Sequence, residues 1–412
     1  MRLSFATFGC RLNHAEALDM EARFAAAGHL VVPIDAEPPP DCIIVRGCSV
    51  TAKAQVECER FIARMRRCHP CSRIVPTGCL PFAEPIAILP PAPSIVPMTT
   101  SRAFLKVQDG CSGRCAFCIV PKFRGPPQSV PFNEVVDRAR AFLAAGFREM
   151  VVTGCNLALY RDSGRGLAEL LAALAELPPP PGQGRALHTA DGTIHRIRLG
   201  SLEPGICDAA VLDAFATHPN ICRSMHLSLQ SGSDRILELM NRPYTAKAVM
   251  DFCIRARRRL GPRCSFGADV IAGFPGETDA DHRATMRLLG RKRAGTPIFS
   301  NLHVFPYSDR PGTLAAQMPD AVPRNIRTAR AKELEAIGVR NRMAFAQSFV
   351  GRKVVACIEK DGDGWTDEYL RVRMPSGLAR RKLVCVKVLA AEDGILRATR
   401  AQGGRQHPGQ RL

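Results

Sequence analysis

Three cysteines lie close together in one short loop, at positions 111, 115 and 118. The apolar run over residues 104–107 predicts a strand, which ends near Asp109-Gly110 and opens into that loop. Three thiolates at C-x3-C-x2-C can ligate one [4Fe–4S] cluster and leave its fourth iron without a protein ligand, open for chemistry. A closed zinc site would need four ligands, and a disulfide is disfavoured in a chain without a signal-peptide pattern.

A second set of three cysteines shares a different pattern, in which each follows a glycine at the end of a strand-like run. The runs cover residues 3–8, 42–46 and 73–77, and the pairs that follow are Gly9-Cys10, Gly47-Cys48 and Gly78-Cys79. Helical patterns over residues 14–27 and 51–67 separate the runs, and such alternation predicts a parallel sheet. Because the ligand crevice of such a sheet lies beyond the carboxyl ends of its strands, we expect the three thiols to meet there. Three unrelated buried cysteines would be the simpler alternative, but it does not account for the recurrence.

Strand–helix alternation resumes at residue 102 and continues for six units. The predicted strands cover residues 103–107, 148–153, 195–199, 224–229, 265–271 and 300–305. The predicted helices cover residues 132–145, 166–177, 206–217, 234–259 (split at Arg242-Pro243) and 278–293. Six successive units predict an open, partial (β/α)6 barrel with its active site at the carboxyl ends of the strands. The fold class is therefore α/β, with an N-terminal parallel α/β domain before the barrel.

Glycines and polar side chains follow several of the barrel strands. Gly154 comes after the second strand, Glu203 after the third and Gln230 after the fourth, while Asp269 lies within the fifth. Such side chains could hold the hydroxyl and amino groups of a nucleoside-bearing cofactor, and glycine lets backbone amides approach a ligand closely. Each residue alone is better explained by a surface turn, but as a set at matching positions they predict a pocket.

The chain changes character near residue 345. Alternating runs over residues 350–358, 369–374, 383–389 and 395–399 predict short strands between turns, and hence a small antiparallel β-barrel. Its basic residues could follow a phosphate backbone or form an ordinary solvated surface, and the charge pattern alone favours neither. They are Arg352, Lys353, Arg371, Arg373, Arg380, Arg381, Lys382 and Lys387. The tail at residues 401–412 is rich in Gly, Arg and Gln, and we expect it to be disordered.

Composition limits the class of protein. A chain of 412 residues is long enough for two or three domains. Seventeen cysteines, in a chain that starts with a strand-like run, indicate a reducing compartment, and we expect a cytoplasmic protein. The formal net charge of +19 favours a polyanionic partner such as nucleic acid, although an arginine-rich genome explains part of it. No run approaches the roughly 20 apolar residues of a membrane span.

Together these motifs resemble the methylthiotransferase family of radical S-adenosylmethionine (SAM) enzymes. The loop at residues 111–118, with Phe117 before its last cysteine, is similar to the radical SAM signature. Three segments resemble the family's N-terminal domain: Thr7-Phe-Gly-Cys-Arg-Leu-Asn13, Cys48-Ser-Val-Thr-Ala-Lys53 and Thr77-Gly-Cys-Leu80. Three more resemble its barrel: Ser228-Leu-Gln-Ser-Gly-Ser233, Asp269-Val-Ile-Ala-Gly-Phe-Pro-Gly-Glu-Thr278 and His303-Val-Phe-Pro-Tyr-Ser308. Arg-Leu-Asn after Cys10, and residues 153–157, resemble the branch that acts on threonylcarbamoyladenosine in tRNA.

The resemblance implies a domain order along the whole chain. Residues 1–82 would form the methylthiotransferase N-terminal domain, residues 83–101 a proline-rich linker, residues 102–344 the radical SAM barrel and residues 345–400 a TRAM-like RNA-binding domain. The chain departs from the family pattern in two places. Only the linker separates Cys79 from Arg102, so the N-terminal domain is shortened, and Cys155 stands where an aliphatic residue is commoner.

The resemblance also implies two [4Fe–4S] clusters and SAM as cofactors. Cys111, Cys115 and Cys118 would hold the cluster that binds SAM, and Cys10, Cys48 and Cys79 would hold a second cluster that carries the sulfur. An electron from a donor such as flavodoxin or ferredoxin would cleave SAM to a 5′-deoxyadenosyl radical, which removes hydrogen from C2 of adenosine 37 in the tRNA anticodon stem-loop. A second SAM would supply the methyl group.

Five further residues are implied as contacts of SAM. Phe117 would lie near its adenine, with Gly154, Glu203, Gln230 and Asp269 as additional contacts. The protein would place the reactants and exclude water, while the cofactors carry the difficult chemistry.

Three alternatives remain open at this stage. The same chemistry could act on isopentenyladenosine in tRNA or on an aspartate of a ribosomal protein. The chain could instead be a zinc-dependent RNA-binding protein without catalytic activity. In the third alternative, the N-terminal cysteines serve only as an electron relay.

Overall fold

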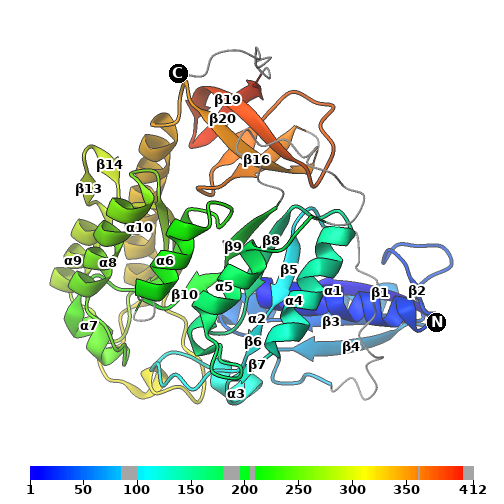
Figure 1. The fold of residues 1–412 in the computed structure, drawn as a ribbon. Coiled ribbons are helices and arrows are strands. Elements are labelled where there is room, and N and C mark those ends of the chain that lie inside the picture. The colour runs from blue at the N-terminus through cyan, green and yellow to red at the C-terminus, as the bar shows by residue number, and fades with distance from the viewer. Residues whose placement is uncertain (85–99, 180–194, 205–208, 361, 402–412) are drawn as a thin grey trace, which may run out of the picture.

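The structure is a computed structural model that describes residues 1–84, 100–179, 195–204, 209–360 and 362–401. Figure 1 shows three parts: an N-terminal α/β unit (blue), a central arc of strands covered by helices (cyan to yellow), and a C-terminal β-barrel (orange to red). Most of the predicted linker and nearly all of the predicted tail lie outside the described residues. Among those described, no helix combines the length and the apolar composition of a membrane span.

The N-terminal unit is built on a parallel sheet of four strands. Their order is β2 (Leu30–Val31), β1 (Arg2–Thr7), β3 (Cys42–Gly47) and β4 (Arg73–Gly78). The apolar run of β3 is buried, as expected for a central strand of a parallel sheet. Two helices connect the strands, α1 (Arg11–Ala26) and α2 (Ala52–Cys68). The side chain of Thr51 accepts a hydrogen bond from the backbone N–H of Ala54 and so caps the start of α2.

The central part is an arc of six parallel strand positions, which form two sheets that follow one another. One sheet contains β5 (Ala103–Lys106), β8 (Glu149–Thr153) and β9 (Arg196–Leu199), and the other contains β10 (Ser201–Leu202), β11 (Ser224–Gln230), β12 (Ser265–Ala272) and β15 (Phe299–Pro306). Only Gly200 separates β9 from β10, and a parallel bridge between Ile197 and Ile221 continues the pairing. The predicted partial barrel is confirmed.

Helices cover the outer face of this arc (Figure 1). They are α4 (Phe132–Ala144), α5 (Leu167–Ala175), α6 (Ala209–Thr217), α7 (Asp234–Leu239), α8 (Ala246–Leu260) and α9 (Asp279–Leu289). One core cluster combines their apolar faces with strand residues such as Val152, Leu227 and Ala268. The helical pattern is interrupted at Arg242-Pro243 as the sequence predicts, and α8 begins after a Thr245 cap. Shorter elements are β6 (Gln108–Asp109), α3 (Val120–Arg124), β7 (Gln128–Ser129), η1 (Leu157–Leu159), β13 (Lys292–Arg293), β14 (Thr296–Pro297) and η3 (Ala315–Gln317).

The longest helix of the described chain, α10 (Arg324–Gln347), was not among the sequence-based predictions. Its buried face includes Gly338 and Asn341, which interrupt the apolar periodicity. Both have packing roles. A Cβ atom at Gly338 would approach Leu302 of β15 to 3.1 Å, so glycine lets the helix lie close to the sheet. Asn341 donates hydrogen bonds to two backbone carbonyls, those of Leu289 and Phe299.

The C-terminal part is a closed barrel of five short strands. Their order is β16 (Lys353–Lys360), β17 (Asp363–Thr366), β18 (Arg371–Arg373), β20 (Ile395–Arg400) and β19 (Leu383–Glu392). All pairs are antiparallel, as predicted, except β18 with β20, which are parallel. The end of α10 contributes Phe345 to the core of this barrel.

A buried ionic network fixes the C-terminal barrel to the central arc. Glu149 is fully buried and accepts hydrogen bonds from Arg196 (2.6 Å) and Arg198 (2.8 Å). Both guanidinium groups also donate to the turn after β17, Arg196 to the carboxylate of Asp367 (2.8 Å) and Arg198 to its carbonyl (3.1 Å). In the same turn, the hydroxyl of Tyr369 accepts a 2.8 Å hydrogen bond from Arg11, next to Cys10. The turn therefore contacts both other parts of the molecule.

Candidate functional site

The cysteine loop at residues 111–118 starts where β6 ends, and its sulfur atoms accept hydrogen bonds. The Gly113 backbone N–H donates to Cys111 Sγ (3.3 Å), and Arg242 Nη1 donates to Cys115 Sγ (2.9 Å). A Cβ atom at Gly113 would lie 3.2 Å from the sulfur of Cys111 and 3.7 Å from that of Cys115, so both sulfurs lie around this glycine. Burial and the neighbouring Cys115 and Cys111 raise the pKa of the Cys118 thiol to about 11. The three sulfurs thus converge on one region.

The second trio lies at the carboxyl ends of three adjacent strands, with Cys10 after β1, Cys48 after β3 and Cys79 after β4. Gly9 makes the close approach possible, because a Cβ atom there would lie 2.4 Å from Cβ of Cys48 and 2.9 Å from its sulfur. Burial and the nearby thiols of Cys10 and Cys79 raise the pKa of Cys48 to about 11. Cys10 is exposed whereas Cys48 and Cys79 are buried, so this trio opens to solvent on one side.

The donor sets differ from that of a closed zinc site. Each set consists of three cysteines, Cys111, Cys115 and Cys118 in one loop and Cys10, Cys48 and Cys79 at three adjacent strand ends. Three thiolates can hold a [4Fe–4S] cluster and leave its fourth iron without a protein ligand, whereas a closed structural zinc site takes four ligands. Both trios therefore fit a [4Fe–4S] cluster better than a closed zinc site.

Arg124 connects the two cysteine sets. It ends α3, six residues after Cys118, and its Nε donates to Cys79 Sγ at 3.1 Å. Its Nη1 donates to Asp109 (3.0 Å), and its two Nη atoms donate to the two carboxylate oxygens of Glu16 (3.0 Å each). Burial alone would lower the pKa of Arg124, but Glu16, Cys79 and Asp109 raise it, so the guanidinium stays charged between the two sets.

Asn13 supports the same arrangement from α1. Its Nδ2 donates to the backbone carbonyls of Phe8 (2.9 Å) and Gly47 (2.8 Å), which precede Cys10 and Cys48. Its Oδ1 accepts from Arg124 Nη2 at 2.7 Å. Sequence reasoning noted Asn13 only within a motif and missed Arg124. The sequence signal that could have identified Arg124 is a charged residue only six positions after the last cysteine of the loop.

Gly154 lies directly against the base of the cysteine loop. A Cβ atom there would come within 3.0 Å of Gln108, a fully buried residue of β6. Gln108 Oε1 accepts from the backbone N–H of Asn156 (2.8 Å), and its Nε2 donates to the carbonyl of Gly110 (2.7 Å). Gln108, which sequence reasoning also missed, thus joins the loop to the segment after β8.

Glu203 reaches the cysteine loop through Arg242, a residue that sequence reasoning considered only as a helix break. Its Oε1 lies 3.2 Å from Arg242 Nη2, and its Oε2 accepts from Asn156 Nδ2 at 2.7 Å. Arg242 in turn contacts Cys115, so Glu203, Asn156 and Arg242 form one polar chain beside the loop.

Phe117 lies in the cysteine loop, and Gln230 is the last residue of β11. Phe117 packs edge-on against Phe274 with a centroid distance of 6.5 Å. Gln230, buried at the end of β11, has a φ of +67°, a conformation that non-glycine residues seldom adopt and that often marks a functional site.

Asp269 has a different environment from the other predicted SAM contacts. Its Oδ1 lies 2.9 Å from His226 Nε2 and 3.3 Å from His303 Nδ1. Burial would raise the pKa of Asp269, but the two imidazoles hold it well below its ordinary value. The structure therefore places Gly154, Glu203 and Phe117 at or beside the cysteine loop and Asp269 with two histidines.

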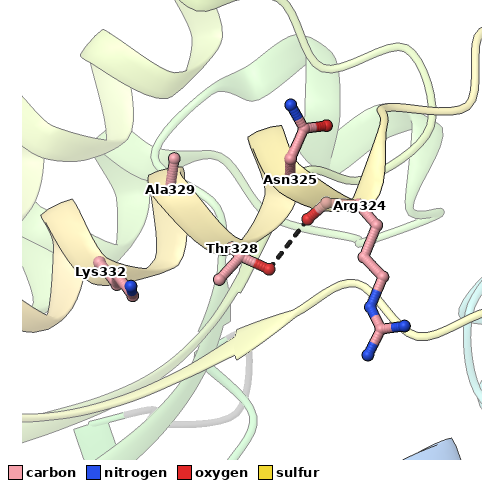
Figure 2. A pocket seen from close by; sticks show the side chains of 5 residues that line it. All are labelled: Arg324, Asn325, Thr328, Ala329 and Lys332. Carbon is pink, nitrogen blue, oxygen red and sulfur yellow. Dashed lines mark hydrogen bonds between the residues drawn. The ribbon is translucent and has the colours of Figure 1, made fainter.

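A separate hollow lies at the start of α10. Figure 2 shows its lining residues, Arg324, Asn325, Thr328, Ala329 and Lys332, and the hydrogen bond from the Thr328 hydroxyl to the Arg324 carbonyl. All five belong to one helix, and none contacts the cysteine sets, so this hollow is not part of the candidate site.

Comparisons with known proteins show what this chain is similar to. The Radical SAM superfamily model matches residues 105–289, and that of the uncharacterized protein family UPF0004 matches residues 2–96. The chain is 30% identical to the threonylcarbamoyladenosine tRNA methylthiotransferase MtaB of Aquifex aeolicus, over 94% of this chain and 100% of that protein. It is 32% identical to the tRNA-2-methylthio-N(6)-dimethylallyladenosine synthase of Saccharophagus degradans, over 85% of this chain and 83% of that protein. The solved structure of the radical SAM methyltransferase TsrM from Kitasatospora setae aligns with a TM-score of 0.49 and 15% identity, over 74% and 72% of the two chains.

The barrel, its cysteine loop and the superfamily match define an enzyme of the radical SAM class. Within that class, the chain belongs to the radical SAM methylthiotransferase family. It is an enzyme that uses SAM and [4Fe–4S] clusters, as its sequence predicted.

Proposed function

We propose that this enzyme adds a methylthio group to C2 of N6-threonylcarbamoyladenosine at position 37 of tRNA, next to the anticodon. The relatives support tRNA methylthiolation as the reaction, because they include enzymes named for threonylcarbamoyladenosine and for dimethylallyladenosine. The observation that carries the proposal is the presence of two cysteine trios, with Arg124 donating both to Cys79 of one trio and to Asp109, two residues before the other trio. Two separate cluster sites are what a reaction with both radical and sulfur chemistry requires.

The donor sets fit the proposed cofactors. Cys111, Cys115 and Cys118 would hold the cluster to which SAM binds, and Cys10, Cys48 and Cys79 would hold the second. When bound, the clusters supply the electron that cleaves SAM and a site for the sulfur to be inserted. The chain itself does the positioning.

The residues beside the cysteine loop would orient SAM. The carboxylate of Glu203 and the backbone at Gly154 lie there, and Phe117 presents an aromatic ring in the same region. Gln230 would contribute from the end of β11. The buried cores around the loop would exclude water from the reacting atoms.

The C-terminal barrel would hold the RNA through part of its basic surface. Arg352, Lys353 and Lys387 are among its exposed basic residues. Arg380 and Arg381 have other partners: Arg380 donates to Glu359 and Ser101, and Arg381 donates to Thr100 and lies over the ring of Phe147. These two therefore help to anchor the barrel, and the phosphate contacts are assigned to the exposed residues.

The function is tested with the reconstituted enzyme under anaerobic conditions. Synthetic anticodon stem-loops with threonylcarbamoyladenosine or isopentenyladenosine at position 37 are incubated with SAM and a chemical reductant, and the nucleosides are analysed by mass spectrometry. We expect methylthiolation of the threonylcarbamoyl substrate. Reaction of the isopentenyl substrate alone would contradict the proposal, and zinc without iron or sulfide in the protein would support the non-catalytic alternative.

A further inference from the structure

The segment that runs from the end of β15 to η3 contacts both parts of the chain that carry cysteine sets. Near its start, the hydroxyl of Ser308 accepts a 2.9 Å hydrogen bond from the backbone N–H of Ala52, four residues after Cys48. At its far end, the backbone N–H of Ala315 donates to the carbonyl of Ala116 in the cysteine loop at 2.8 Å. This segment, here called the bridging segment, therefore joins the surroundings of the two sets from the β15 edge of the arc.

Phe305, near the end of β15, presents an exposed aromatic ring toward the inside of the arc. Among the described residues, Phe82 and Phe305 are the exposed members of the Phe, Tyr and Trp types, and Phe305 is 41% exposed. Its neighbour Val304 packs against the core under the outer helices, so the alternation of side chains along the strand directs Phe305 to the opposite, inner face. Phe305 is paired with Ile271 of β12, whose side chain packs in one cluster with Phe117 of the cysteine loop. The ring therefore lies one strand away from a residue that is packed with this loop.

Two more exposed apolar side chains lie on the segments around Phe305. Val50, which is 47% exposed, lies two residues before Ala52. Leu314, which is 62% exposed, directly precedes Ala315 at the end of the bridging segment. A single exposed apolar side chain needs no explanation, but three of them on segments that are hydrogen-bonded to one another indicate a surface that a ligand covers.

The position of this surface favours an RNA base as that ligand. In the proposed reaction, the adenine at position 37 has to reach the space between the two cysteine trios, because hydrogen removal and sulfur insertion both take place at its C2 atom. A base that leaves the stack of an RNA loop loses the contacts of its two faces. Aromatic side chains commonly replace those contacts in proteins that bind unpaired bases.

We propose that Phe305 is the surface on which the adenine base at position 37 of the RNA stacks, with Val50 and Leu314 beside it. The inference rests on the proposed function and adds a residue that positions its substrate. Stacking uses the π face that every base has, so Phe305 would hold the base without selecting the substituent on N6. SAM also contains an adenine, and the experiment separates these two sources of the base.

The test measures how the affinity for RNA depends on the base and on the ring together. Anaerobically reconstituted holoenzyme, with SAM but without reductant, is titrated with two fluorescent stem-loops, one with threonylcarbamoyladenosine at position 37 and one that is abasic there. Kd is measured by fluorescence anisotropy for the wild type, for Phe305→Leu, which keeps an apolar side chain, and for Phe305→Tyr, which keeps the ring. Leu30→Ala is the control, because Leu30 is an exposed apolar residue at the end of the N-terminal sheet away from Cys10.

We expect the wild type to bind the stem-loop that carries the base more tightly than the abasic one. Phe305→Leu should lower this ratio of affinities by at least about fivefold, whereas Phe305→Tyr and Leu30→Ala should keep it. Affinity for the abasic stem-loop should be the same in all four proteins. Iron content, and 5′-deoxyadenosine formation with reductant but without RNA, should also be unchanged, because the ring is assigned to the RNA.

An equal ratio in the wild type and in Phe305→Leu would overturn the inference, and so would equal reductions in Phe305→Leu and Phe305→Tyr. Loss of 5′-deoxyadenosine formation without RNA in Phe305→Leu would assign the ring to the adenine of SAM, and loss of iron would assign it to packing around a cluster. Either result would also overturn the inference. The proposed function is tested separately when reductant is added, since absence of methylthiolation by the wild type would overturn that function whatever the ratios.

Discussion

Arg124 Nε lies 3.1 Å from the sulfur of Cys79, so a charged guanidinium from the segment after one cysteine set donates to a sulfur of the other. The same group is held by Glu16 and Asp109 and cannot easily turn away. A hydrogen bond and a positive charge beside a cluster sulfur stabilise the reduced cluster and so raise its reduction potential.

We therefore expect Arg124→Gln to lower the reduction potential of the cluster that we propose for Cys10, Cys48 and Cys79. Methylthiolation should fall by at least tenfold, while SAM cleavage continues. Potentiometric titration monitored by EPR measures the first effect, and product analysis measures the second. Arg140→Gln, which alters an exposed ion pair with Asp137, should change neither. An unchanged potential in Arg124→Gln would remove the electrostatic role assigned to this residue.

Replacement of Cys48 should separate the functions proposed for the two clusters. Cys48→Ala should reduce bound iron from about eight to about four atoms per chain, since each cubane contains four. It should leave SAM cleavage intact and abolish methylthiolation. Iron and sulfide assays with 5′-deoxyadenosine measurement test this directly, and Cys68→Ala, at an exposed cysteine, serves as control. Residual methylthiolation in Cys48→Ala would favour the electron-relay alternative.

Gly9 and Gly28 are matched positions for testing whether the close packing of backbone around the N-terminal cysteines is needed for cluster binding. Both have positive φ, +97° and +84°, but only Gly9 faces a close neighbour, the side chain of Cys48. Alanine at either position costs about 1–2 kcal/mol in backbone strain. At Gly9 its Cβ atom would also clash with the side chain of Cys48. We expect Gly9→Ala to lose the N-terminal cluster, with about half of the iron, and Gly28→Ala to retain it. Equal iron contents in the two variants would show that the close approach is not required.

Glu368 should make stability depend on pH. Burial and Asp367 raise its pKa from 4.5 to about 7 in the folded protein. The unfolded chain gives up this proton first as pH rises, so the stability from the protonated form is complete below pH 4.5 and is lost as pH rises toward about 7. Glu368→Gln, which cannot ionise, should thus be more stable than the wild type at pH 8 and similar at pH 5. Urea unfolding at both pH values checks this, with the exposed Glu238→Gln as control.

The elements that hold the cysteines were predictable because their signals are local. The strands that become β1, β3 and β4 are apolar runs that end at Gly-Cys pairs, and parallel topology follows from the helices between them. The partial barrel was recognised for the same reason. The helix α10 was missed because Gly338 and Asn341 break its periodicity, although both are buried for specific contacts with the sheet.

The polar residues around the cysteines were less accessible to sequence reasoning. Arg124, Gln108 and Arg242 act through contacts with residues that are distant in sequence, and an isolated arginine or glutamine has no pattern of its own. The histidines beside Asp269 belong to the same category. Their relationship depends on the register of three strands, which a hydrophobic pattern fixes only to within its two-residue period.

The turn after β17 has a mechanical consequence. The turn accepts hydrogen bonds from Arg196 and Arg198 of the central arc and from Arg11 of the N-terminal unit. The barrel that we propose to bind RNA is therefore held in place against the residue next to Cys10. If RNA binds to the C-terminal barrel, these contacts would fix its distance from Cys10. A fixed distance would place one nucleotide of a folded RNA loop at the proposed sulfur site and would keep the neighbouring nucleotides away from it.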